Sequence, residues 1–156
     1  MDKMETEEGY QAYEEAANIL KATNPLPELS PSKGLRKIAA DFFKEIKEKD
    51  PDNLGNIDLK SIISKYGSFS ATFENIIDFG SNSPEIIVRN LIVCDGMPER
   101  DNRNILLSKD FLKVGAAFGE HCTYRYCTII NLCNEFKNAD NSDDLEVYGW
   151  KDTMTY

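Results

Sequence analysis

The sequence of 156 residues is poor in histidine and tryptophan, with one of each, and it has no long run of apolar residues. A single histidine leaves one imidazole for the whole chain, so a metal site with two histidine ligands is excluded. No apolar stretch approaches the ~18 residues that a helix needs to cross a bilayer, so we expect no membrane span. The first residues, MDKMETEEGYQAYEEA, also lack the cationic and apolar segments of a secretory signal. We therefore expect a cytoplasmic protein.

Cations are scarce relative to acids, since 18 Lys and Arg stand against 27 Asp and Glu, a net charge of −9. This balance argues against nucleic-acid binding and against an anionic membrane surface, both of which require clustered cations. The acids gather at the ends: residues 1–30 hold seven acids and two lysines, and residues 136–156 hold five acids and two lysines. Residues 31–50 are the exception, with six cations and four acids. The acidic ends favour basic protein partners.

The chain has four cysteines, which in a cytoplasmic protein are expected to be reduced thiols rather than a disulfide framework. Cys127 and Cys133 fall on one predicted strand and would lie roughly 20 Å apart at ~3.3 Å per residue. That separation excludes both a disulfide between them and a shared tetrahedral metal. We expect free, mostly buried thiols and no bound metal.

The composition that remains is that of a globular protein, with 41% hydrophobic residues and 10% aromatic residues. We expect a single domain over residues 1–136, followed by an acidic C-terminal tail over residues 137–156. Apolar periodicity and turn residues predict helices over 13–22, 35–46, 59–66 and 84–93, and strands over 72–79, 111–118 and 124–133. The helix over 35–46 is expected to start at Ser30–Pro31. This order of elements predicts an α+β protein with a small antiparallel sheet flanked by helices.

The segment DPDNLGNIDLKS, residues 50–61, resembles a calcium-binding loop between two helices. Leu54 and Ser61, however, occupy positions five and twelve of that loop, and position twelve requires a bidentate Glu. We therefore interpret the segment as a polar turn in which Asp58 caps the following helix.

His121 is the only candidate for the general base of a Ser–His or Cys–His hydrolase. It lies in the predicted turn between the strands over 111–118 and 124–133. We expect this histidine to be exposed to solvent rather than catalytic.

Several motifs follow one another along the second half of the chain: ENIIDFG at 74–80, SPEIIV at 83–88, LIVCDGMPER at 91–100, DNRNIL at 101–106 and DFLKVGAAFGEH at 110–121. In this order they resemble the CAP superfamily of cysteine-rich secretory, antigen 5 and pathogenesis-related proteins. The likeness covers about residues 10–136 and is closest to the protozoan and bacterial branch. The resemblance implies a three-layer α-β-α sandwich with a central cleft. In the family, two histidines and two acids line this cleft and can hold a divalent cation.

Carried over residue by residue, the resemblance implies a degenerate cleft. Glu74 matches the acid of the family's Gly-Glu-Asn motif, and Asp95 matches one acid of its Asp-Asp pair. Asn102 stands where the His-Arg motif has its histidine, Arg103 is retained, and His121 matches a later histidine outside the tetrad. Phe69 lies about where the upstream histidine of the tetrad would fall.

Two consequences follow from this degenerate cleft. Without the two imidazoles, the cleft lacks the ligands of a transition metal, so the resemblance implies no catalytic residue, metal or cofactor. An alternative role for Glu74 is structural, as a buried carboxylate paired with Arg103.

These features together predict a non-enzymatic intracellular CAP-like protein that acts as a protein-interaction or scaffold component, for example in a cytoskeletal or ciliary assembly. An alternative is a sterol-binding or lipid-binding protein in which the apolar helices over 35–46 and 86–93 line a groove. A metal-dependent hydrolase is a third and weaker hypothesis.

Overall fold

The computed structural model describes residues 5–144, and these form two compact units. Unit 1 comprises residues 5–27 and 82–109, and unit 2 comprises residues 28–81 and 110–144. The predicted domain over 1–136 therefore consists of two units, each of which joins stretches that are distant in the sequence. No helix in residues 5–144 is both long enough and apolar enough to cross a membrane.

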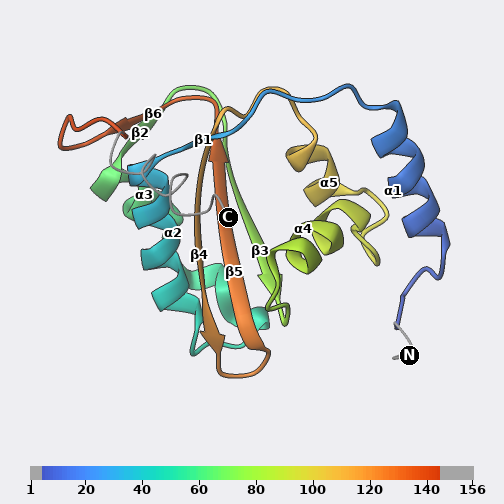
Figure 1. Cartoon of the computed structure of the whole chain (residues 1–156). Helices are drawn as coiled ribbons and strands as arrows, with labels where there is room; N and C mark the ends of the chain where they lie inside the picture. The colour runs from blue at the N-terminus through green and yellow to red at the C-terminus, as the bar shows by residue number, and fades with distance from the viewer. Residues whose placement is uncertain (1–4, 145–156) are drawn as a thin grey trace, which may run out of the picture. The chain divides into compact units, whose positions relative to one another are not determined.

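Unit 1 consists of three helices, α1 (Gln11–Ala22), α4 (Pro84–Val93) and α5 (Asp101–Leu106). Figure 1 shows α4 and α5 side by side. The small side chains of Ala12 and Ala16 on α1 are buried against Val93 at the end of α4. Pro84 occupies the first turn of α4, as its fixed φ angle favours. The helix ends at Val93, as predicted, and its C-cap residue Cys94 has a left-handed backbone conformation.

Unit 2 contains a four-stranded sheet in the order β1-β4-β5-β3. The strands are β1 (Ser30–Pro31), β3 (Phe73–Phe79), β4 (Lys113–His121) and β5 (Arg125–Cys133). β5 pairs antiparallel with both β3 and β4, whereas β1 pairs parallel with β4. The α+β class is confirmed. The expectation of a purely antiparallel sheet is wrong, because β1 makes the sheet mixed.

The predicted helix start at Ser30–Pro31 is also wrong, since both residues pair with β4 and the helix α2 (Lys33–Ile46) begins two residues later. The hydroxyl of Ser32 caps it by accepting a hydrogen bond from the backbone N–H of Leu35 at 3.3 Å. The apolar face of α2 packs on the sheet (Figure 1). Its buried residues are Gly34, Leu35, Ile38, Ala39, Phe42 and Ile46.

The close approach of α2 to β4 depends on Gly115. A Cβ atom at this position would lie 2.2 Å from the backbone nitrogen of Arg36 and 2.3 Å from the carbonyl carbon of Leu35. Side chains cannot occupy such distances, so glycine is required where the helix crosses the strand.

The rest of unit 2 is a short 3-10 helix η1 (Pro51–Asn56), the helix α3 (Leu59–Tyr66) and a two-stranded ribbon of β2 (Gly67–Phe69) and β6 (Phe136–Asn138). The cap predicted at Asp58 is confirmed, since its Oδ1 accepts from the backbone N–H of Ser61 at 3.0 Å. The predicted tail boundary at residue 137 falls inside β6. Residues 145–156 of the predicted tail lie outside the described residues.

Candidate functional site

Two of the predicted cleft residues, Arg103 and Asp95, form hydrogen bonds with other groups of unit 1. Arg103 is 1% exposed and forms an ion pair with Glu15 on α1. Its Nε donates to the carbonyl of Ile92 at 2.6 Å, and its Nη2 donates to the carbonyls of Val93 at 2.8 Å and Ala12 at 3.2 Å. A guanidinium with these partners ties the end of α4 to the start of α1.

Arg100 makes a second set of contacts beside Arg103. Its guanidinium is 6% exposed, is bidentate to the carboxylate of Glu8 and donates through Nε to Glu15 at 3.2 Å. Hydrogen bonds from Arg100 lower the pKa of Glu8 and the pKa of Glu15, and Arg103 lowers the pKa of Glu15 further. We call these four residues, Glu8, Glu15, Arg100 and Arg103, the ion-pair clamp.

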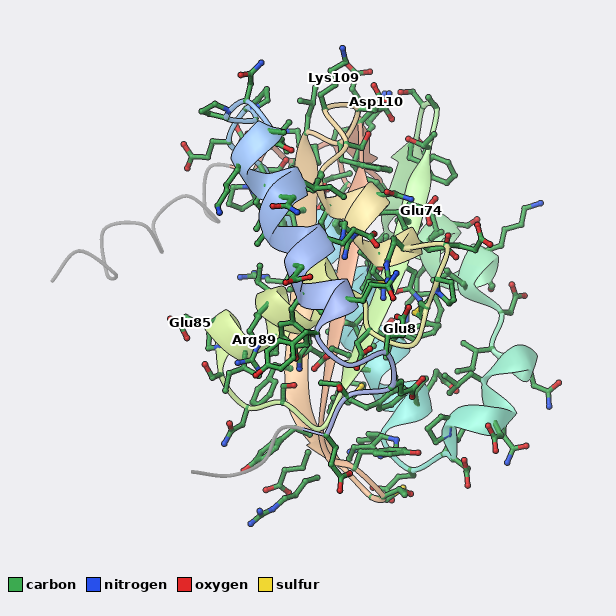
Figure 2. The ribbon with its side chains drawn as sticks, turned by 90° about the vertical axis from the view of Figure 1, so that its right-hand side faces the viewer. Glu8, Glu74, Glu85, Arg89, Lys109 and Asp110 are labelled. Carbon is green, nitrogen blue, oxygen red and sulfur yellow. The ribbon has the colours of Figure 1, made fainter. Side chains whose placement is uncertain are left out.

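Asp95 extends the ion-pair clamp into the segment that leads to α1, where Glu8 lies (Figure 2). Its carboxylate accepts from the backbone N–H of Glu7 at 2.8 Å and of Glu8 at 3.0 Å. In return, the backbone N–H of Gly96 donates to Glu8 at 2.8 Å. Asn102, by contrast, approaches only the thioether of Met97, at 3.9 Å. Asp95 and Arg103 are thus structural residues of unit 1.

Glu74 and His121 belong to unit 2 and lie at opposite ends of its sheet. Glu74 on β3 (Figure 2) is opposite Leu132 of β5, whereas His121 on β4 is opposite Arg125. These positions are seven residues apart along β5, roughly 23 Å at ~3.3 Å per residue. The structure therefore does not bring Glu74 and His121 into one site. Since Arg103 uses Glu15 as its carboxylate, the alternative pairing of Glu74 with Arg103 is wrong.

His121 is 5% exposed, so the expectation of an exposed histidine is wrong. Its Nδ1 accepts from the backbone N–H groups of Thr123 and Tyr124, at 3.1 and 3.2 Å. An Nδ1 that accepts two hydrogen bonds carries no proton, so Nε2 is the protonated nitrogen and donates to the carbonyl of Lys49 at 3.0 Å. Nδ1 thus closes the β4–β5 turn and Nε2 joins it to the segment after α2, so neither ring nitrogen is available to a substrate or a metal.

Among the residues that the structure describes, no group of three or more His, Cys, Asp and Glu is arranged to hold a metal ion. The four cysteines are free, as predicted, and only Cys122 is exposed. Burial raises the pKa of Cys127 and of Cys133 to about 12. The apolar residues of α2 are packed in the core of unit 2.

An apolar groove lies on unit 2 between α3 and β2, and we call it the Phe69 groove. Its volume is about 450 Å³, and its apolar walls are Leu59, Ile63, Phe69 and Phe73. Phe69 is 40% exposed and its ring centre lies 5.4 Å from that of Phe73. Phe69 also lines a second hollow of about 630 Å³ along the β2–β6 ribbon, which has charges of both signs. The exposed ring of Phe69 therefore borders two hollows, and exposed apolar surface of this kind is a candidate binding site.

The position of Phe69 follows from the pairing of β2 with β6. Phe69 is opposite Phe136, and Gly67 lets the two strands come together, because a Cβ there would lie 2.1 Å from the carbonyl oxygen of Lys137. The resemblance placed Phe69 near a lost histidine but gave it no role. Exposure of an aromatic residue on a short strand depends on strand pairing, which the local sequence does not reveal.

One lysine of α3 lines the Phe69 groove. Among the described residues, Lys60 is the only charged one that lines the groove. On the other side of α3, the ammonium groups of Lys65 and Lys37 lie 5.3 and 6.0 Å from the centre of the Tyr66 ring. Lys65 is also paired with Asp41 at 3.4 Å. The cation that faces the Phe69 groove is thus Lys60.

Comparisons with known proteins bear on the fold. No family model and no curated protein matches the chain. The α+β fold is shared with an outer surface protein from the bacterium Borrelia burgdorferi, at a TM-score of 0.55 and 19% sequence identity. The likeness covers 84% of this chain and 96% of that one. The prediction of a cytoplasmic location is wrong on this finding, because the similar structure belongs to an outer surface protein.

Proposed function

We propose that this chain is a non-enzymatic, CAP-like domain that binds another protein through the Phe69 groove. The observation that carries the proposal is an exposed phenylalanine between two hollows of an otherwise well-packed unit. Exposed apolar walls of this kind are a common feature of protein-binding surfaces, where aromatic residues supply much of the binding energy.

The contacts of the cleft residues support the absence of catalysis. A general base or a metal ligand needs a free lone pair directed at the substrate or ion. Hydrogen bonds to backbone groups or to the ion-pair clamp occupy the polar atoms of Asp95, Arg103 and His121. Asn102 cannot act as a general base near neutral pH.

The walls and the rim of the groove indicate the chemistry of the partner. Apolar walls accept an aliphatic or aromatic side chain, and Lys60 favours a carboxylate beside it. We therefore propose a protein segment with one or two large apolar side chains flanked by Asp or Glu. This differs from the basic partner that the net charge of −9 favours, because binding depends on local rather than overall charge.

The likeness to an outer surface protein supports a proposed location at the cell surface. A cytoskeletal or ciliary assembly requires a cytoplasmic location and does not agree with a location at the cell surface. Labelling of intact source cells with a membrane-impermeant biotin reagent tests the location. We expect labelling of the chain before lysis, and labelling only after lysis would contradict it.

Selection from a random peptide library displayed on phage tests the binding function. The full chain serves as the target, and the Phe69→Ser variant serves for counter-selection. We expect enriched peptides with an apolar residue flanked by acids, which bind Phe69→Ser at least tenfold more weakly. Val88→Ser, at an apolar residue of similar exposure on α4 and outside the groove, is the matched control and should bind as the unmodified chain does. Absence of enrichment, or equal binding to Phe69→Ser, would overturn the proposal.

A further inference from the structure

β4 presents an open strand edge in unit 2. Its inner side pairs with β5 along its whole length, from Lys113 to His121. Its outer side pairs only with the two residues of β1, at Lys113 and Val114. From Gly115 to His121, no strand in the described part of the chain lies beside this outer side.

The direction of the backbone groups along this edge follows from the alternation of a strand. The carbonyl of Val114 points outward, where it accepts from Ser32 of the segment after β1 at 2.8 Å. The N–H and C=O groups of Ala116, Phe118 and Glu120 therefore also point outward. These three residues form a regular row of donors and acceptors, and all three are exposed.

The edge lacks the features that usually prevent strand pairing. Residues 114–121, VGAAFGEH, contain no lysine and no proline, and Glu120 is the only acid. Phe118 is 52% exposed and stacks on Tyr126 of β5 with ring centres 5.6 Å apart and an interplanar angle of 16°. A flat apolar surface thus adjoins the open backbone groups.

We propose that this edge pairs with β4 of a second copy of the chain, antiparallel and about a two-fold axis at Phe118. An antiparallel edge is complementary to itself, so one surface supplies both halves of the interface. In this register, residues 115–121 of one copy face residues 121–115 of the other. The pairing of β1 with Lys113 and Val114 is retained in each copy. The two four-stranded sheets become one sheet of eight strands.

The charges along the edge agree with this register. Glu120 of one copy lies opposite Ala116 of the other, so the two carboxylates do not face each other. Lys113, the cation of this strand, is paired with Asp144 of its own copy at 3.6 Å. The register therefore places no like charges opposite each other.

Variants of opposite charge at Phe118 test the proposed dimer, and sedimentation velocity on the full chain measures its formation. We expect the unmodified chain to dimerise at micromolar concentration, and Phe118→Lys and Phe118→Glu each to be monomeric, because like charges meet at the two-fold axis. An equimolar mixture of the two variants should restore the dimer. The matched control is Val88→Lys, at a residue of 50% exposure on α4, which should dimerise as the unmodified chain does.

A monomeric unmodified chain at millimolar concentration would overturn the proposal, as would a dimeric Phe118→Lys variant or a mixture that stays monomeric. Circular dichroism melts of each variant show that loss of the dimer is not loss of the fold. The test is independent of the Phe69 groove, because a groove that binds no peptide leaves the dimer unchanged.

Discussion

Unit 1 and unit 2 are stabilised by different kinds of interaction. Unit 1 has a small apolar cluster of Ala12, Ala16 and Val93, and its main contacts are those of the ion-pair clamp. Unit 2 has a continuous apolar interface between α2 and the sheet, in which Gly115 allows backbone contact. The difference shows why charged residues at motif positions need not be catalytic: in unit 1 they replace the core that three short helices cannot form.

The largest effect is expected from removal of a buried charge in unit 1. Arg103→Ala removes the hydrogen bonds to three backbone carbonyls and the buried ion pair with Glu15, so we expect a loss of about 3–5 kcal/mol in the free energy of unfolding. Urea denaturation followed by circular dichroism measures this loss. The exposed Arg89→Ala variant on α4 is the control and should change the free energy by less than about 0.5 kcal/mol. Equal effects of the two substitutions would contradict the role of the ion-pair clamp.

In unit 2, the corresponding test is steric. Gly115→Ala forces α2 away from β4, and we expect it to lower the free energy of unfolding by about 1–3 kcal/mol. Gly55→Ala is the matched control, because a Cβ there meets no atom within 4 Å. It should be neutral or should stabilise the protein by up to about 1 kcal/mol. A Gly115→Ala variant as stable as Gly55→Ala would show that the close contact is not required.

The two units should also respond to acid with opposite sign. Arg100 lowers the pKa of Glu8 and Glu15 from 4.5, so their contribution to stability is present above pH 4.5 and is lost as the pH falls through the lowered values. Burial raises the pKa of Asp78 in unit 2 above 3.8, so its contribution is present below pH 3.8 and is lost as the pH rises through the raised value.

Substitution of one carboxyl in each unit separates these contributions. Glu15→Gln should flatten the pH dependence of amide exchange in α1, and Asp78→Asn should slow amide exchange in β3 at neutral pH. Hydrogen exchange measured by mass spectrometry between pH 3 and pH 7 provides both readouts. An unchanged pH profile in α1 of Glu15→Gln would contradict the assignment.

The smallest expected effect is in the reactivity of the cysteines, which are found in both units. At pH 8, iodoacetamide should label the exposed Cys122 first. Cys94 in the less apolar unit 1 should follow, and Cys127 and Cys133 should be labelled last, because burial raises their pKa to about 12. Timed mass spectrometry measures this order. Labelling of Cys127 before Cys94 would reverse the inferred order of local stability.

The sequence predicted the helices and strands well where apolar periodicity was strong, as in α2, α3 and the β4–β5 hairpin. It missed β1, because Ser30 and Pro31 also fit the start of a helix, and their pairing with β4 is a tertiary contact. It also could not show the partners of Arg103, since Glu15 lies 88 residues away in the sequence. The spacing of Arg100 and Arg103 by three residues, and of Glu8 and Glu15 by seven, is the only local sign of the ion-pair clamp.

The central claim is that the charged motif residues hold the fold while the Phe69 groove binds the partner. The most direct test is isothermal titration of one peptide selected on the full chain into two variants, Phe69→Ser and Asn102→Ala, with their melting temperatures measured in parallel. We expect at least tenfold weaker binding for Phe69→Ser, unchanged binding for Asn102→Ala and unchanged melting for both. Binding that Asn102→Ala abolishes and Phe69→Ser leaves intact would contradict the claim.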